Sequence, residues 1–119
     1  MQIGETLTVN TPGEFRRWLS HHHTTRKEIW LVIYKKAFGH ATIAYEDAVE
    51  EALCFGWIDG IVKSIDPEKY AQRFVPRRKG SHWTEANLAK ARRLTAEGRM
   101  AAAGRAVLPQ EWKDEDDHP

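Results

Sequence analysis

The strongest limit on the fold comes from an unbroken apolar run at residues 29–34, with the sequence IWLVIY. β-branched and aromatic side chains dominate this run, and such residues favour strands. A half-buried strand would alternate apolar and polar side chains, which this run does not do. We therefore expect a central strand that is covered on both faces. Lys35 and Lys36 then return the chain to solvent, and Gly39 marks a turn.

Turn and capping residues divide the rest of the chain into short elements. Thr11 suits a helix cap, Pro12 suits the first helical position, and Glu14 completes a capping box. The pair Asp66-Pro67 is typical of a turn and predicts an antiparallel hairpin. The periodicity predicts helices over 12–22, 45–53, 84–97 and 101–108, and hairpin strands over 57–64 and 70–75, the second ended by Pro76. Tyr45 falls on the apolar face of its helix.

These elements predict an α+β fold in the order α-β-α-β-β-α-α. We expect a small antiparallel sheet of about three strands, packed with four or so helices. Residues 1–109 are expected to form this single domain, since 119 residues is an ordinary length for one core. Residues 110–119 form an acidic tail that we expect to be disordered, although Trp112 could dock.

The composition favours a soluble, cytoplasmic protein. Hydrophobic residues make up 41% of the chain and charged residues 29%, which is ordinary for a globular domain. No apolar run approaches the roughly 18 residues that cross a bilayer, so we expect no membrane insertion. The first residues show no signal peptide. The single cysteine, Cys54, excludes an internal disulfide and fits a reducing compartment.

Charge is unevenly distributed along the chain. Residues 63–109 carry eleven basic and four acidic side chains, whereas the last ten residues carry one basic and five acidic ones. A basic stretch of this kind suggests an anionic partner, or a tail that folds back on the basic surface. The alternative is that these charges form a solvated helix face.

Signatures of conventional enzymes are missing from the sequence. It contains no Gly-rich phosphate loop, GxSxG elbow or paired-carboxylate motif, so catalytic residues stay unknown and no cofactor is expected. Three consecutive histidines, 21–23, point about 100° apart on a helix and do not converge on one ion, so no metal site is expected. Cys54 is either a buried small hydrophobe or a reactive thiol.

A string of polar and aromatic residues around the hairpin is the candidate site. Arg77, Arg78 and Lys79 lie just ahead of a helix that begins near Ser81 or Thr84, where free backbone N–H groups and guanidinium groups favour an anion. The candidate ligand-binding residues are Trp57, Asp59, Arg73, Arg77, Ser81, Trp83 and Asn87. The two tryptophans would supply stacking surfaces, and Asp59 shares a strand face with Trp57.

A scaffold interpretation of the same residues stays open. Asp59 would then pair with Arg73 or Arg77, Ser81 or Thr84 would only cap the helix, and both tryptophans would belong to the core.

Several blocks of the chain resemble the YdeI/OmpD-associated (bacteriocin-protection) family. They are FRRWL at 15–19, WLVIYKK at 30–36, ALCFGWID at 52–59, RFVPR at 73–77, SHWTEAN at 81–87 and EGRM at 97–100. The resemblance covers about residues 14–108. It implies a link to bacteriocin protection and to an outer-membrane porin, indirect for a chain without an export signal, and it implies no catalytic activity or cofactor.

Three functions follow as hypotheses. The first is a binding module that recognises a small anionic ligand or a protein partner in antimicrobial or envelope stress tolerance. The second is nucleic-acid binding through the basic stretch, with Arg92 and Arg93 on its helix. The sequence pI of about 7.9 is low for a dedicated nucleic-acid binder. The third is an enzyme of unknown class that uses Asp59 as a base beside Arg73 and Arg77.

Overall fold

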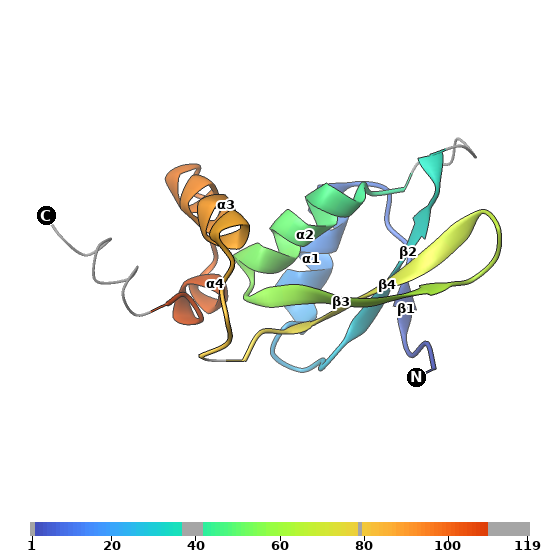
Figure 1. Cartoon of the computed structure of the whole chain (residues 1–119), viewed down its shortest axis with the longest axis horizontal. Coiled ribbons are helices and arrows are strands. Elements are labelled where there is room, and N and C mark those ends of the chain that lie inside the picture. Colours follow the sequence, from blue (N-terminus) through green and yellow to red (C-terminus); the bar gives the residue numbers. More distant parts are fainter. Residues whose placement is uncertain (1, 37–41, 79, 110–119) are drawn as a thin grey trace, which may run out of the picture.

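The structure, a computed structural model, describes residues 2–36, 42–78 and 80–109. Four strands form one sheet in the order β1-β2-β4-β3. Figure 1 shows two helices lying over one face of this sheet and two more beyond one end of it. The strands are β1 (Thr6–Leu7), β2 (Ile29–Tyr34), β3 (Trp57–Ser64) and β4 (Lys69–Pro76), and the helices are α1 (Pro12–His22), α2 (Tyr45–Cys54), α3 (Glu85–Ala96) and α4 (Ala102–Ala106).

The predicted α+β class is confirmed, but the predicted sheet is wrong in detail. The sheet is mixed, because β1 runs parallel to β2 while β2–β4 and β3–β4 are antiparallel. The observed order is therefore β-α-β-α-β-β-α-α. β1 is only two residues long, too short to leave a pattern in the sequence, and its pairing is extended by Trp30 N–H donating to the Glu5 carbonyl at 2.9 Å. The sequence predicts that this strand ends at Val75, but β4 includes Pro76 as its last residue.

β2 is the interior strand that the apolar run predicts, since it lies between β1 and β4 and five of its six residues are buried. Ile29 and Leu31 face the helices and belong to the core. Trp30 alternates to the opposite face, where it is nevertheless fully buried. There its indole N–H donates to Glu28 at 3.0 Å, and Glu28 also binds Arg73 at 2.8 Å. On the second face, Trp30 is thus accompanied by the polar side chains of Glu28 and Arg73.

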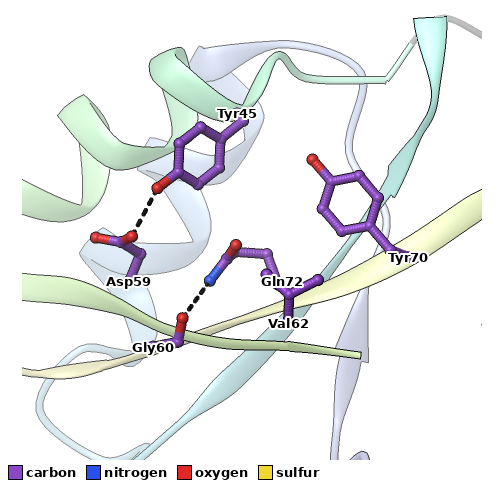
Figure 2. A pocket seen from close by; sticks show the side chains of 6 residues that line it. All are labelled: Tyr45, Asp59, Gly60, Val62, Tyr70 and Gln72. Carbon is purple, nitrogen blue, oxygen red and sulfur yellow. Dashed lines mark hydrogen bonds between the residues drawn. The ribbon is translucent and has the colours of Figure 1, made fainter. Parts of the chain in front are cut away.

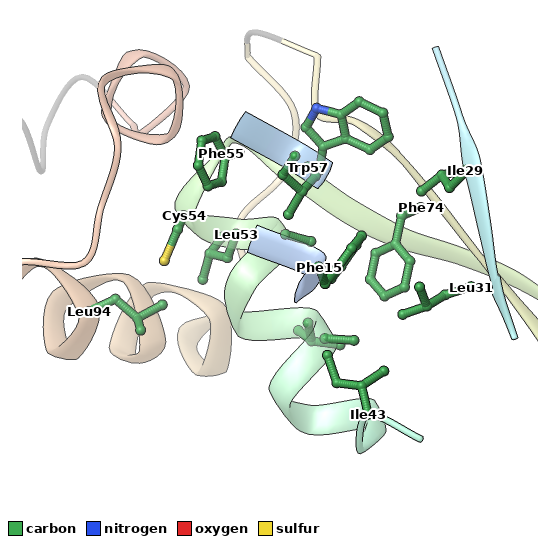
Figure 3. Packing of buried hydrophobic residues seen from close by; sticks show 14 of the residues in the cluster. Phe15, Ile29, Leu31, Ile43, Leu53, Cys54, Phe55, Trp57, Phe74 and Leu94 are labelled. Carbon is green, nitrogen blue, oxygen red and sulfur yellow. The ribbon is translucent and has the colours of Figure 1, made fainter. Parts of the chain in front are cut away.

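The core lies between the sheet and the helices α1 and α2 (Figure 3). Phe15 and Leu19 point inward from α1, and the Phe15 ring lies 5.5 Å from that of Phe74 on β4. Thr11 caps α1 through a bond that its hydroxyl accepts from the Glu14 N–H, as the sequence predicts. Burial of these large side chains is the main source of stability for the domain.

Close backbone contacts fix α4 against the C-terminal end of α2. Gly56 has a φ of +75°, and a Cβ built there would lie 2.8 Å from the Ala103 carbonyl oxygen. A Cβ on Gly104 would lie 2.3 Å from the Cys54 carbonyl oxygen. The Ala101 N–H donates to the same carbonyl at 2.9 Å. Two glycines therefore allow an approach that no other residue permits.

A charged network joins α1, α2 and the segment between α3 and α4. Glu51 is buried, and its two carboxylate oxygens accept from Arg16 at 3.1 Å and from Arg99 at 2.9 Å. Arg16 also donates to the Arg99 carbonyl at 2.7 Å. The network holds the segment between α3 and α4 against α1 and α2. Among the helices of the described ranges, none combines the length and apolarity that a membrane crossing requires.

Candidate functional site

A break in the β3–β4 ladder opens a recess on the helix-covered face of the sheet. The register shifts between Asp59 and Val62, which frees the backbone carbonyls of the residues between them. The side chain of Gln72 fills this break: its amide nitrogen donates to the carbonyls of Gly60 at 2.9 Å and Arg73 at 3.1 Å. Three carbonyl oxygens, the third that of Ile61, surround that nitrogen, so the orientation of the amide is determined.

The recess is a shallow pocket of about 350 Å³ (Figure 2). Its lining comes from the start of α2 and from both strands of the hairpin: Tyr45, Asp59, Gly60, Val62, Tyr70 and Gln72. The Tyr45 hydroxyl donates to Asp59 Oδ2 at 2.6 Å. Val62 is 55% exposed and gives the pocket an apolar rim. A volume of this size fits a small organic group.

The two tyrosines of the pocket resist ionisation. Burial, followed by the hydrogen bond to Asp59, raises the pKa of Tyr45 to about 12. Burial also raises the pKa of Tyr70, and the negative charge of Glu46 adds to this. Both hydroxyls therefore stay neutral at physiological pH and act as hydrogen-bonding groups rather than as bases.

A second pocket adjoins the first, with a volume of about 410 Å³. The two share Tyr45 and Tyr70, and the second is lined in addition by Lys35, Lys36 and Glu46. Gly39, the turn that the sequence indicates, lies outside the described residues.

Arg77 is the centre of the other candidate region. It is only 6% exposed, and its Nε has no hydrogen-bond partner among the described residues. Its Nη1 donates to the His82 carbonyl at 3.0 Å and to the Ser81 hydroxyl at 3.4 Å. The guanidinium lies 4.0 Å from the centre of the Trp83 ring. Burial lowers the pKa of Arg77, and the charge of Asp59 partly offsets this.

Three of the predicted site residues, Arg77, Ser81 and Trp83, thus come together. Asn87 lies on the first turn of α3, where its N–H donates to the hydroxyl of Thr84, the helix cap. Lys79, named with this basic segment, lies outside the described residues.

The other predicted residues lie elsewhere. Trp57 is 2% exposed and packs edge-on against Trp18 in the core, at 5.9 Å between ring centres. Arg73 pairs with Glu28 on the sheet face opposite the helices. Asp59 makes a hydrogen bond to Tyr45 and no ion pair with a described residue. The scaffold interpretation therefore describes Trp57, but its pairing of Asp59 with Arg73 or Arg77 is wrong, because Arg73 binds Glu28 and Asp59 faces a pocket.

Sequence reasoning missed the tyrosines and the glutamine of the pocket. Tyr45, predicted on the apolar face of α2, is 37% exposed and lies at the pocket wall. Tyr70 and Gln72 alternate with the core residue Phe74 along β4, so they share its face. Polar groups at inward-facing strand positions are a usable signal, because a buried amide needs partners or a ligand.

Two other residues that the sequence singles out, Cys54 and a histidine of the 21–23 run, pack against other residues of the domain. Cys54 is fully buried, and burial raises the pKa of its thiol. His23 lies against the Phe55 ring, and its Nδ1 is 2.8 Å from the Leu19 carbonyl oxygen. Within the part of the chain that the structure describes, no three metal-ligating side chains form a group that could hold an ion.

Comparison with known proteins gives a family but no activity. No curated protein and no solved structure matches the chain. A family model described as Domain of unknown function (DUF8412) matches residues 7–107, which include the four helices and all of the sheet except Thr6. The chain therefore belongs to the DUF8412 family.

Proposed function

We propose that this protein is a ligand-binding module that recognises a small anionic group, such as a phosphate or a carboxylate, at Arg77, Ser81 and Trp83. One observation carries the proposal: Arg77 is a buried guanidinium without a carboxylate within 4 Å among residues 2–36, 42–78 and 80–109. A buried charge is costly unless it is paired, so a site that keeps one is suited to an incoming opposite charge.

Other arginines of the domain support the proposal, because their surroundings differ from those of Arg77. Arg16 and Arg99 share the carboxylate of Glu51, and Arg73 binds Glu28. Arg77 instead bonds to a neutral carbonyl and a hydroxyl, and it stacks on an aromatic ring. Those contacts orient the guanidinium without neutralising it.

The start of α3 adds to the same electrostatic field. Trp83 and Thr84 precede this helix of 12 residues, and only the Asn87 N–H is satisfied by the Thr84 side chain. Free N–H groups of a first helical turn and the positive end of the helix dipole both favour anions. The guanidinium and the helix start are joined by the Arg77–Trp83 stack.

The resemblance to the YdeI/OmpD-associated family adds a setting to this proposal, namely antimicrobial or envelope stress tolerance in which the bound anion or an anionic protein partner is the signal. Nucleic acid ranks below it as a ligand. Arg93, one of the two arginines singled out on α3, is already paired with Glu50 and Glu97. An enzyme that uses Asp59 as its base ranks lowest, because Arg73 lies on the other face of the sheet.

The test is the response of the melting temperature to inorganic phosphate, sulfate and acetate at constant ionic strength. The wild-type protein is expected to gain stability, by about 2.7 kcal/mol at 100 times the dissociation constant. Arg77→Ala removes that gain, because no other described group replaces the guanidinium. Its own melting temperature also falls, since the contacts to His82 and Trp83 are lost. Arg77→Lys keeps the charge but loses the planar fork, and its response is intermediate.

Arg78→Ala is the matched control, because Arg78 is the next residue, is exposed and carries the same charge. It is expected to respond to anions as the wild type does. Equal responses of wild type, Arg77→Ala and Arg78→Ala would show that the guanidinium is only part of the scaffold.

A further inference from the structure

The pocket between α2 and the β3–β4 hairpin presents an unusual set of free polar atoms. Asp59 Oδ2 accepts from Tyr45, but no described residue donates to Asp59 Oδ1. The Gln72 nitrogen makes all three of its bonds to carbonyls, which leaves the amide oxygen without a donor in the described structure. Figure 2 shows this oxygen on the side of the amide that faces away from Gly60, between Asp59 and Tyr70.

These atoms are acceptors, and one of them carries a negative charge. The Tyr70 hydroxyl makes no hydrogen bond to a described residue and completes the set. The Tyr45 proton is already committed to Asp59. None of the residues that line this pocket is basic: Lys35 and Lys36 line the adjoining pocket, and Lys69, on the opposite face, binds Asp66 and Tyr34. A ligand that matches this pocket must donate hydrogen bonds and carry positive charge.

The walls of the pocket suit the rest of such a ligand. The rings of Tyr45 and Tyr70 stand on either side, and tyrosine faces attract organic cations. Val62 offers an exposed apolar surface for an alkyl chain. The volume of about 350 Å³ is ample for a short aliphatic amine.

We infer that this pocket binds a small organic cation with N–H donors, an alkylammonium or alkylguanidinium group, with the Asp59 carboxylate, the Gln72 amide oxygen and the Tyr70 hydroxyl as the polar groups around it and the rings of Tyr45 and Tyr70 beside it. This site shares no residue with the anion site at Arg77 and is tested independently of it. The same chemistry is offered by a free amine and by a lysine or arginine side chain of a polypeptide.

The test uses the whole chain, titrated with n-butylammonium and n-butylguanidinium and followed through the ring resonances of Tyr45 and Tyr70. Dissociation constants of about 1 mM are expected for ligands of this size. Two probes lack one property each: n-butanol has no charge, and tetramethylammonium has no N–H donor. Both are expected to bind at least tenfold more weakly. No binding by either amine at 20 mM, or equal binding by the two control probes, would overturn the inference.

Variants locate the binding. Asp59→Asn keeps an acceptor for Tyr45 but removes the charge, and we expect it to weaken butylammonium binding at least tenfold. Asp47→Asn, on the exposed side of α2, is the matched control and binds as the wild type does. Tyr70→Phe is the second variant; it leaves the ring and removes one acceptor, so binding weakens severalfold while the fold is retained. Unchanged binding in both Asp59→Asn and Tyr70→Phe would place the cation elsewhere and reject the site.

Two further probes distinguish the sources. N-acetyl-lysine methylamide and N-acetyl-arginine methylamide carry the same cations on a peptide unit. Tighter binding of these than of the butyl compounds assigns the pocket to a side chain of a polypeptide; the reverse assigns it to a free amine. Phosphate binding tests the anion proposal separately. Asp59→Asn removes a negative charge near Arg77, so we expect this variant to bind phosphate at least as tightly as the wild type does.

Discussion

Replacing Glu51 by glutamine tests whether the buried carboxylate holds α1, α2 and the segment after α3 together. Its side chain is 6% exposed and receives one bond from Arg16 and one from Arg99, at 3.1 and 2.9 Å. A glutamine can accept from one arginine, but its NH₂ group then faces the donors of the other. Hydrogen bonds to charged groups contribute about 1.5–3 kcal/mol each, and removing one partner of a buried pair costs about 3–5 kcal/mol.

The two arginines reduce this cost, because they are 36% and 34% exposed and water can solvate them in the variant. We therefore expect Glu51→Gln to lower the free energy of unfolding by about 3 kcal/mol, measured by urea denaturation at pH 7. Glu5→Gln is the control, since Glu5 pairs with Arg26 outside this network and the two side chains are 49% and 43% exposed. It is expected to cost about 0.5 kcal/mol. A loss below about 1 kcal/mol for Glu51→Gln, or equal losses for the two variants, would refute the reasoning.

Two further predictions concern the pocket and the α4 contact. The folded pKa of Tyr45, about 12, lies above its ordinary value of 10, so protonated Tyr45 stabilises the fold below pH 10 and this contribution is lost as pH rises toward 12. Because Tyr45 is 37% exposed, solvent screening limits this contribution to about 1 kcal/mol. The free energy of unfolding is measured by urea denaturation at pH 8 and at pH 11. Between these two values we expect Tyr45→Phe to lose about 1 kcal/mol less than the wild type. Gly104→Ala is expected to cost about 3 kcal/mol in the same assay at pH 7, because its Cβ meets the Cys54 backbone oxygen at 2.3 Å. Gly13→Ala, whose Cβ meets nothing closer than 3.9 Å, is expected to be neutral or slightly stabilising, and an equal loss in both glycine variants would contradict the contact argument.

The sequence predicts those parts of the fold that local chemistry determines. The cap at Thr11, the apolar run of β2 and the turn at Asp66-Pro67 each act over a few residues, and each lies where the pattern indicates. β1 was missed because two residues carry no periodicity, and its parallel partner lies more than twenty residues away. No local signal specifies such a pairing.

The candidate site was only partly predictable, for the same reason. Arg77, Ser81 and Trp83 lie within seven residues of one another, so spacing alone brings them together. The partner of Arg73 is Glu28, 45 residues earlier, and the choice between Glu28 and Asp59 depends on the strand register. The recess at Gln72 depends on a register shift, which is a property of the paired strands and not of either sequence segment.

Asp59 connects the two proposed sites electrostatically. It forms no salt bridge with Arg77, yet its charge supports the protonated guanidinium. A cation bound in the pocket would neutralise that carboxylate and leave the positive field at Arg77 less opposed, which favours an anion there. An anion at Arg77 would in turn reduce the competition for Asp59 and favour the cation, because coupling between two binding sites is reciprocal. Because this carboxylate on β3 is unpaired by any described arginine or lysine, we expect butylammonium and phosphate each to tighten the binding of the other, and Asp59→Asn to remove this coupling.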